Sequence, residues 1–209
     1  LRVRCTSKHK QNLLALAYQS LARHASHPRH SRHSCQEPPR GNRHVPACVD
    51  ELGIDEEATG LLLVAKSELA EDRLTQHFKQ RHTSKRYVAL LSGVPKPESA
   101  PAASLSRVDA NGGVLRIDAP IDRDPSRAGK YCVAANGKAA SSIIHVHALS
   151  SGWCLVTIDL LTGRSHQIRV HCAQCLGAPL ANDDAYGGRR LPGADRQSRP
   201  LLHAWSLEV

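Results

Sequence analysis

Polar and basic side chains are concentrated in one short stretch in the last quarter of the chain: Arg164, His166, Gln167, Arg169 and His171. They follow a glycine turn and stand where the periodicity of apolar residues predicts the start of a helix. Free backbone N–H groups at a helix start favour anions, as do the cationic side chains. The cluster therefore indicates either a site for a phosphate backbone or a place where a carboxylate must stay ionised. A basic face that is simply exposed to solvent is the alternative interpretation.

The elements that must position this cluster are a strand, a tight turn and a helix. Apolar and mixed residues alternate over 153–161, with Cys154, Val156, Ile158 and Leu160 on one side, which predicts a half-buried strand. Gly163 allows the turn, and Ser165 is the expected N-cap. The helix then places its apolar residues on a single face. These are Ile168, Cys172, Cys175 and Leu176.

Further elements follow from the pattern before and after this unit. Residues 61–65 predict a buried strand, Ser67 caps a helix running to about Arg81, and residues 85–93 predict the next strand. The segment 94–108 is rich in Pro, Ala and Ser and is expected to be a loop. A strand over 143–149 and the turn 150–152 form a hairpin with the strand that begins at residue 153.

The cysteines raise the question of a metal or a disulfide. The chain holds seven cysteines, an odd number, and they are scattered, which favours a reducing compartment over a disulfide framework. Cys172 and Cys175 form a Cys-x-x-Cys pair that could bind zinc, but no second pair at suitable spacing accompanies them. Packing on the apolar helix face is the favoured interpretation, with a zinc-binding module as the alternative.

Composition narrows the class of protein. The 209 residues support one domain with an extension, 41% hydrophobic residues suffice for a core, and a net charge of +9 favours a polyanionic partner, nucleic acid first. No run of 18 apolar residues predicts a membrane span. Residues 1–36 contain no Asp or Glu and resemble an organellar targeting region or a plain basic arm. Because the chain lacks methionine and begins at Leu1, we expect its natural N-terminus to lie upstream.

The stretch 162–171 reads Thr-Gly-Arg-Ser-His-Gln-Ile-Arg-Val-His. It resembles the Thr-Gly-Arg-x-His-Gln-Ile-Arg-x-His motif of the RluA-type RNA pseudouridine synthases. Six other segments resemble parts of that family's pattern too: 52–66, 85–93, 115–125, 137–140, 182–187 and the closing strand over 201–209. The sequence departs from the family where Leu52 and Gly53 replace a His-Arg pair, and where Ala58 and Thr59 replace Thr-Ser.

The resemblance implies roles for individual residues. Asp55 falls on the catalytic aspartate, Tyr87 on the tyrosine that packs against the target base, and Arg169 on the arginine that pairs with the aspartate. Without the resemblance, Asp55 would be a turn residue and Tyr87 a core aromatic. RNA contacts are expected from basic and polar side chains along the same surface: Lys85, Arg164, His166, Gln167, Arg189 and Arg190.

The resemblance also implies a fold and a reaction. The fold is α+β, with a mixed, mostly antiparallel central sheet, flanking helices and a basic RNA cleft. Residues 1–47 are then a basic N-terminal arm, and residues 48–209 the catalytic-type domain. In that family uridine is isomerised without a cofactor: the base leaves C1′, rotates and rejoins through C5. We expect no bound metal or cofactor here.

Two functions stay open at this stage besides the zinc module. One is an active isomerase on structured, ribosomal RNA. The other is an RNA-binding relative with weak or no catalysis that serves in ribosome assembly, favoured by the altered Leu52–Gly53 block and the basic arm. Both imply RNA, and with it a pre-ribosomal particle and its assembly proteins, as partners, and neither implies a membrane. The expected location is the mitochondrion, or otherwise another reducing compartment inside the cell.

Overall fold

A computed structural model describes residues 57–61, 63, 65, 67–96, 113–195 and 198–209 in full, and the backbone of 47–48, 64 and 104–107. Asp55, which is expected to be the catalytic aspartate, the Leu52–Gly53 block and nearly all of the predicted arm over 1–47 lie outside these residues. No helix among those described is long and apolar enough to cross a bilayer.

A seven-stranded sheet organises the described chain. Its strands lie in the order β2–β11–β4–β10–β9–β6–β5, and every neighbouring pair is antiparallel except the parallel pair β2–β11. The strand bounds are β2 Thr59–Gly60, β4 Ser84–Leu91, β5 Ser104–Arg107, β6 Val114–Asp118, β9 Ser141–Ser150, β10 Trp153–Leu160 and β11 Leu202–Glu208. This mixed, mostly antiparallel sheet confirms the predicted α+β class.

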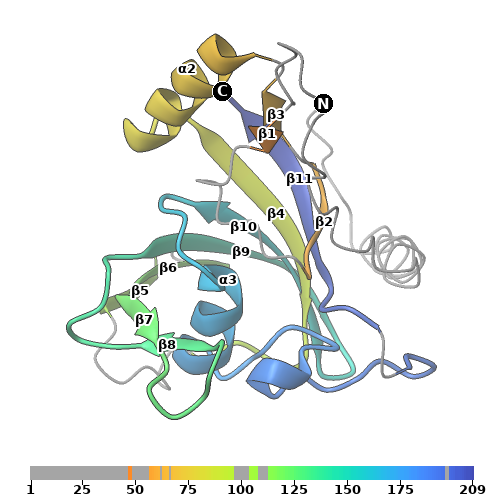
Figure 1. Cartoon of the computed structure of the whole chain (residues 1–209). Coiled ribbons are helices and arrows are strands. Elements are labelled where there is room, and N and C mark those ends of the chain that lie inside the picture. The colour runs from red at the N-terminus through yellow and green to blue at the C-terminus, as the bar shows by residue number, and fades with distance from the viewer. Residues whose placement is uncertain are drawn as a thin grey trace.

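Two small sheets and a few helices complete the fold. One small sheet pairs β1 Ala47–Cys48 with β3 Val64–Ala65, and the other pairs β7 Ile121–Arg123 with β8 Tyr131–Val133. The helical elements of the described residues are α2 Glu68–Lys79, α3 Gln167–Val170, the π-helix η3 His171–Cys175 and the 3-10 helix η4 Asp184–Tyr186. Figure 1 shows α3 in front of the main sheet and α2 at the end of the sheet where β4 begins.

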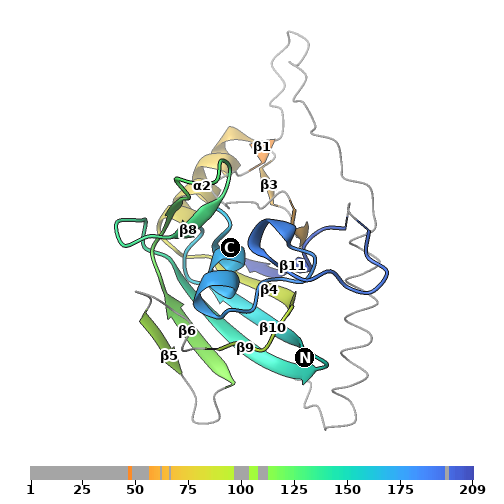
Figure 2. The same cartoon turned by 90° about the horizontal axis from the view of Figure 1, so that it is seen from below.

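The core lies between the main sheet and the α3–η3 segment. Figure 2, from below, shows β5, β6, β9, β10 and β4 side by side beneath this segment. As predicted, Cys154, Val156 and Ile158 of β10 are buried against Ile168 and Leu176. The alternation of apolar residues along β10 therefore sets which side of the strand receives the helix.

The helix over residues 67–81 is confirmed as α2. The Ser67 hydroxyl accepts a hydrogen bond from the backbone N–H of Ala70, as expected of an N-cap. Ala70, Leu74 and Phe78 recur every four residues and pack against Ala65.

Two strand predictions need correction. Residues 61–65 do not form one strand: β2 ends at Gly60, Leu61 is 57% exposed, and β3 begins only at Val64, in a different sheet. Residues 104–107, predicted as part of a loop, form β5, which pairs with β6 from Ser104↔Asp118 to Arg107↔Leu115. The free edge of β6 supplies backbone partners there, and such tertiary pairing overrides a weak local preference.

Candidate active site

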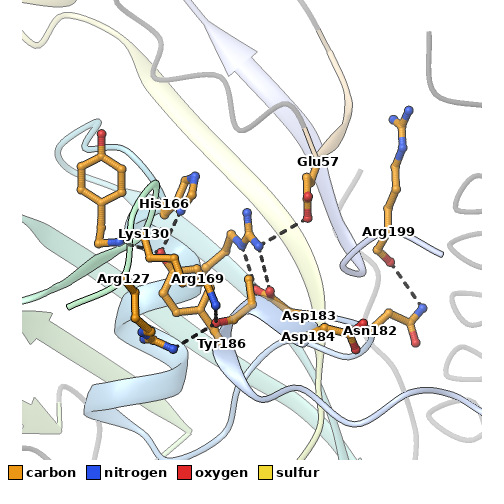
Figure 3. Close-up of polar contacts among 12 residues, drawn as sticks. Glu57, Arg127, Lys130, His166, Arg169, Asn182, Asp183, Asp184, Tyr186 and Arg199 are labelled. Atoms are coloured by element: carbon orange, nitrogen blue, oxygen red, sulfur yellow. Dashed lines mark hydrogen bonds and ion pairs between the residues drawn. The ribbon is translucent and has the colours of Figure 1, made fainter. Parts of the chain in front are cut away.

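A buried arginine lies at the centre of the candidate site. Arg169 is 3% exposed, and its Nε and Nη2 donate to Oδ2 and Oδ1 of Asp183, each at 2.8 Å. Nη2 also lies 3.3 Å from Oε2 of Glu57, a residue 112 positions earlier in the sequence (Figure 3). A guanidinium is always charged and matches a carboxylate with two parallel bonds, so this arginine can hold carboxylates ionised in a buried place.

Asp183 is fixed by the backbone around it. Its residue is fully buried, and its carbonyl accepts from the N–H groups of Tyr186 and Gly188 at 3.1 and 2.8 Å. The preceding Asn182 has φ 63°, a left-handed conformation, which explains how asparagine stands where the family pattern has glycine. Gly188 cannot carry a side chain, because a Cβ there would lie 1.9 Å from the carbonyl oxygen of Leu180.

An aromatic cluster covers one side of the arginine. The Arg169 guanidinium lies 5.0 Å from the centroid of the Tyr186 ring. The Tyr186 oxygen accepts from the backbone N–H of Tyr131 at 3.0 Å, and it is hydrogen-bonded to Nδ1 of His166 at 2.8 Å (Figure 3). The His166 ring also meets the Tyr131 ring edge-on, with centroids 5.1 Å apart. The hairpin β7–β8 is thus joined to the site through these rings.

The turn before the helix is held by a buried polar network rather than by the expected cap. Gln167 Oε1 accepts from the Thr162 hydroxyl at 2.8 Å and from the Arg164 N–H at 3.0 Å. Its Nε2 donates to the Ser141 carbonyl and the Ser142 hydroxyl, both at 2.9 Å. Because the Gln167 side chain satisfies the backbone of the turn, no separate N-cap side chain is needed there.

The prediction that Ser165 is the N-cap of this helix is therefore wrong. The N-cap position is His166, in a left-handed conformation with φ 53° and without a side-chain cap bond. Ser165 is exposed, and its hydroxyl binds the phenol of Tyr131, which lowers the pKa of that tyrosine. The left-handed backbone conformation of His166 is strained, and such strain is often found at functional sites. Here it accompanies the placement of the His166 ring between the rings of Tyr131 and Tyr186.

His171 is buried in the same network. Its Nε2–H donates to the Ala119 carbonyl and its Nδ1 is hydrogen-bonded to the Ser142 hydroxyl, both at 3.0 Å, an arrangement that a neutral ring can satisfy. Burial lowers the pKa of His171, so the neutral form is favoured. The interpretation of the basic cluster as a solvated face is thus wrong, since Gln167, Arg169 and His171 are all buried.

The predicted RNA-binding residues separate into two groups. Lys85 and Arg164 lie where β10 ends, since Lys85 pairs with Leu160 and Arg164 belongs to the following turn. Arg189 lies at the opposite end of β10, with its guanidinium 4.7 Å from the Trp153 ring and Nη2 donating to the Gly152 carbonyl at 2.6 Å. Arg190 pairs with Asp184 on the surface.

The structure does not test the predicted roles of three site residues, Tyr87, Gln167 and Asp55. Tyr87 lies half-buried on β4, on the same side as Ala89, and packs against the main core. Gln167 is 2% exposed and its amide bonds inside the protein, so its described contacts position the turn. Asp55 lies outside the described residues, two positions before Glu57.

Sequence reasoning missed the carboxylates that Arg169 binds. Asp183 lies in the segment 182–187, which resembles the family pattern Gly-Asp-x-x-Tyr-Gly, and that aspartate and tyrosine were a usable signal. Glu57 lies in a run of acidic residues, where nothing distinguishes it from a solvated turn residue. The bidentate partner of Arg169 is therefore Asp183 among the described residues.

Cys172 and Cys175 pack on the apolar face of the helix, which confirms the favoured interpretation. Cys172 and Cys175 are both buried in the main core beside Cys154. Burial raises the pKa of all three thiols, to about 12 for Cys154 and about 11 for Cys175, whereas zinc binds the thiolate. Among the described residues, no group of three or more His, Cys, Asp or Glu side chains is arranged to hold a metal ion.

Comparison with known proteins agrees with this fold. Residues 5–174 match the family model described as RNA pseudouridylate synthase, so the chain belongs to that family. The match begins ahead of residue 48, and the boundary between arm and domain stays a prediction.

Relatives and solved structures point the same way. The chain is 37% identical over 162 residues to ribosomal large subunit pseudouridine synthase D of Nitrosomonas europaea, covering 75% of this chain and 42% of that protein. It is 33% identical over 171 residues to an uncharacterized RNA pseudouridine synthase of Zymomonas mobilis, covering 81% and 69%. The structure of human RNA pseudouridylate synthase domain containing 1 superposes with a TM-score of 0.55 at 30% identity, covering 74% of this chain and 60% of that one. The chain thus spans less than half of its Nitrosomonas relative.

Proposed function

We propose that this chain isomerises uridine to pseudouridine in structured ribosomal RNA. The observation that carries the proposal is the buried Arg169, which is bound to Asp183 and to Glu57 in a member of the pseudouridylate synthase family. Ribosomal RNA as the substrate is supported by the similarity to the Nitrosomonas relative, which is named as a synthase of the ribosomal large subunit.

Asp55 is the proposed reactive carboxylate. The 3.3 Å contact between Glu57 and Arg169 supports this assignment, because it brings the segment that follows Asp55 to the arginine. A carboxylate in a closed RNA cleft tends to take up a proton, and a nearby guanidinium opposes this. Arg169 would thus keep Asp55 ionised for attack on the sugar or base, or for proton abstraction.

The reaction balances without a cofactor. The N1–C1′ bond of uridine breaks, the base rotates, and a C5–C1′ bond forms. C5 then loses its proton and N1 gains one, so no electrons are exchanged with another molecule. Tyr87 is proposed to pack on the extruded base, whose unstacking costs a few kcal/mol.

Basic side chains near the site are proposed to contact the RNA backbone. Arg164 and His166 occupy the turn beside Arg169, and Lys85 precedes Tyr87 on β4. Arg189 and Arg190, at the far end of β10, are proposed to extend this contact. Their internal partners also give them structural roles.

Chemical labelling of pseudouridine tests the function. Cells carrying Asp55→Asn should lose one or more pseudouridines from ribosomal RNA, whereas cells carrying Asp72→Asn, an exposed aspartate on α2, should keep them. Unchanged pseudouridine in the Asp55→Asn cells, with the protein still bound to RNA, contradicts the isomerase. That outcome favours the alternative of a catalytically inactive ribosome assembly factor.

The location and larger partners are proposed as well. We propose that the protein acts in the mitochondrion on a pre-ribosomal particle. The absence of Asp and Glu from residues 1–36 supports the location. Fractionation of cells, followed by sedimentation of the mitochondrial extract, should find the protein with large-subunit particles. Recovery in the cytosol alone contradicts this proposal.

A further inference from the structure

A basic pocket lies beside the candidate site and contains two of the proposed RNA contacts, Lys85 and Arg164. It has a volume of about 400 Å³ and lies between the end of α2, the start of β4 and the turn after β10. Figure 1 shows these three segments close together at the upper left of the sheet. Lys79, Arg81, Lys85 and Arg164 line it, and no acidic residue is among the lining residues that the structure describes.

Lys85 is the unusual member of this pocket. It is 7% exposed, and its Nζ lies 4.7 Å from the centroid of the Phe78 ring. Within the described part of the chain no carboxylate pairs with it. Burial lowers the pKa of Lys85, because a desolvated ammonium without a counter-ion is costly. An anion in the pocket would remove that cost.

The fold anchors Arg164 through its side chain and Arg81 through its backbone. Nε of Arg164 donates to the Ala139 carbonyl at 3.0 Å, and its backbone N–H is held by Gln167. Arg81 directly follows the C-cap of α2 in a left-handed conformation with φ 59°, and its N–H donates to the Phe78 carbonyl at 3.1 Å. A site whose groups are already fixed loses less conformational entropy on binding.

The pocket lies about one nucleotide away from the position proposed for the target base. Lys85 and Tyr87 lie two residues apart on the same side of β4, about 7 Å along the strand. This separation is comparable to one nucleotide of an RNA backbone. A strand whose base lies against Tyr87 would therefore bring a neighbouring phosphate to Lys85.

We propose that the pocket formed by Arg81, Lys85 and Arg164 is a phosphate subsite that holds the RNA backbone next to the extruded uridine. The inference rests on the proposed function and deepens it, because it fixes the direction in which the RNA strand leaves the site. Lys85 and Arg81 act in binding, and the isomerisation itself does not require them.

Salt-dependent binding tests the subsite. The probe is an in vitro transcript of the large-subunit ribosomal RNA from the source organism, with uridines tritiated at C5. Lys85→Met and Arg81→Gln should each raise the Kd about tenfold. Each should also reduce the slope of log K against log salt by about 0.7, the value for one phosphate contact on a single strand. Arg73→Gln, an exposed arginine of α2 away from the pocket, is the matched control and should change neither.

The outcomes separate the subsite from the function. Arg81 is exposed, so Arg81→Gln keeps the test valid even if Lys85→Met does not fold. An Arg81→Gln protein that binds RNA like Arg73→Gln overturns the subsite. So does inorganic phosphate that binds the wild-type pocket while RNA binding is the same in all variants. Wild-type protein that binds RNA but releases no tritium overturns the isomerase, and the variants still decide the subsite.

Discussion

Two adjacent aspartates each bind an arginine, in opposite surroundings. Asp183 is fully buried and holds Arg169, itself 3% exposed, through two bonds of 2.8 Å. Asp184 has a side chain that is 60% exposed and pairs with Arg190 at the surface. The same aspartate–arginine ion pair is therefore buried in the candidate site in one case and exposed to solvent in the other.

The difference shows which arginines of a basic chain matter for the site. In water an ion pair gains little, because solvent already stabilises both charges. In the interior each charge depends on its partner, so losing one leaves the other uncompensated. The predictions below test this contrast, starting from the largest expected effect.

Asp183→Asn should lower the free energy of unfolding by about 3 kcal/mol, because it removes the main counter-ion of a buried guanidinium. The half-exposed Glu57 retains its contact with Arg169 and limits the loss. Urea unfolding followed by circular dichroism measures the change. A loss no larger than that of Asp184→Asn would mean that Arg169 does not depend on its buried partner.

His171→Gln should lower the free energy of unfolding by about 2 kcal/mol, because the Ser142 and Ala119 partners are then poorly satisfied. The same urea experiment measures it. His82→Gln, an exposed histidine after α2, is the control and should leave stability unchanged.

The His171 variant also has a pH signature. Burial lowers the folded-state pKa of His171 below the ordinary 6.5, so the unfolded chain takes up the proton first as pH falls. Wild-type stability should therefore decrease below about pH 6.5 until the folded pKa is reached. The stability difference between wild type and His171→Gln should be constant above pH 6.5 and shrink below it. A difference that grows with acid would contradict a buried neutral ring.

Arg189→Gln should cost about 1 kcal/mol, because it removes the stacking on Trp153 and the bond to the Gly152 carbonyl. Thermal unfolding monitored by circular dichroism detects the change. Arg190→Gln is the neighbouring comparison with a smaller expected loss. Equal losses would show that the stacked arginine contributes no more than the surface ion pair.

Asp184→Asn should change the free energy of unfolding by less than about 1 kcal/mol, since its pair with Arg190 is exposed. Raising the salt concentration should reduce even this difference. A loss close to that of Asp183→Asn would remove the distinction between the two aspartates.

Local pattern was sufficient for much of the fold. The alternation along β10, the Ser67 cap and the four-residue spacing of α2 each depend on neighbours in sequence, and all three are confirmed. The division of residues 59–65 into β2 and β3 depends instead on two different distant partners, β11 and β1. A short apolar run contains no information about which sheet its ends will join.

The site divides in the same way. Arg169 was identified because its motif is dense and specific, and Tyr87 because it lies in a second matching segment. The contacts of Arg169 with Asp183 and Glu57 span 14 and 112 residues and arise only when the chain is folded. The replacement of Ser165 by Gln167 as the group that holds the turn has the same cause, since the amide of Gln167 is oriented by Ser141 and Ser142 of β9.

The irregular pairing of β11 has a practical use. Its register against β4 shifts between Ala204, opposite Tyr87, and Ser206, opposite Arg86, and the intervening Trp205 is 64% exposed. The chain has two tryptophans, and the other one, Trp153, is the first residue of β10 and stacks with Arg189. The protein thus contains a native optical probe next to Tyr87, and in a Trp153→Phe background quenching of Trp205 emission would follow the arrival of RNA in real time.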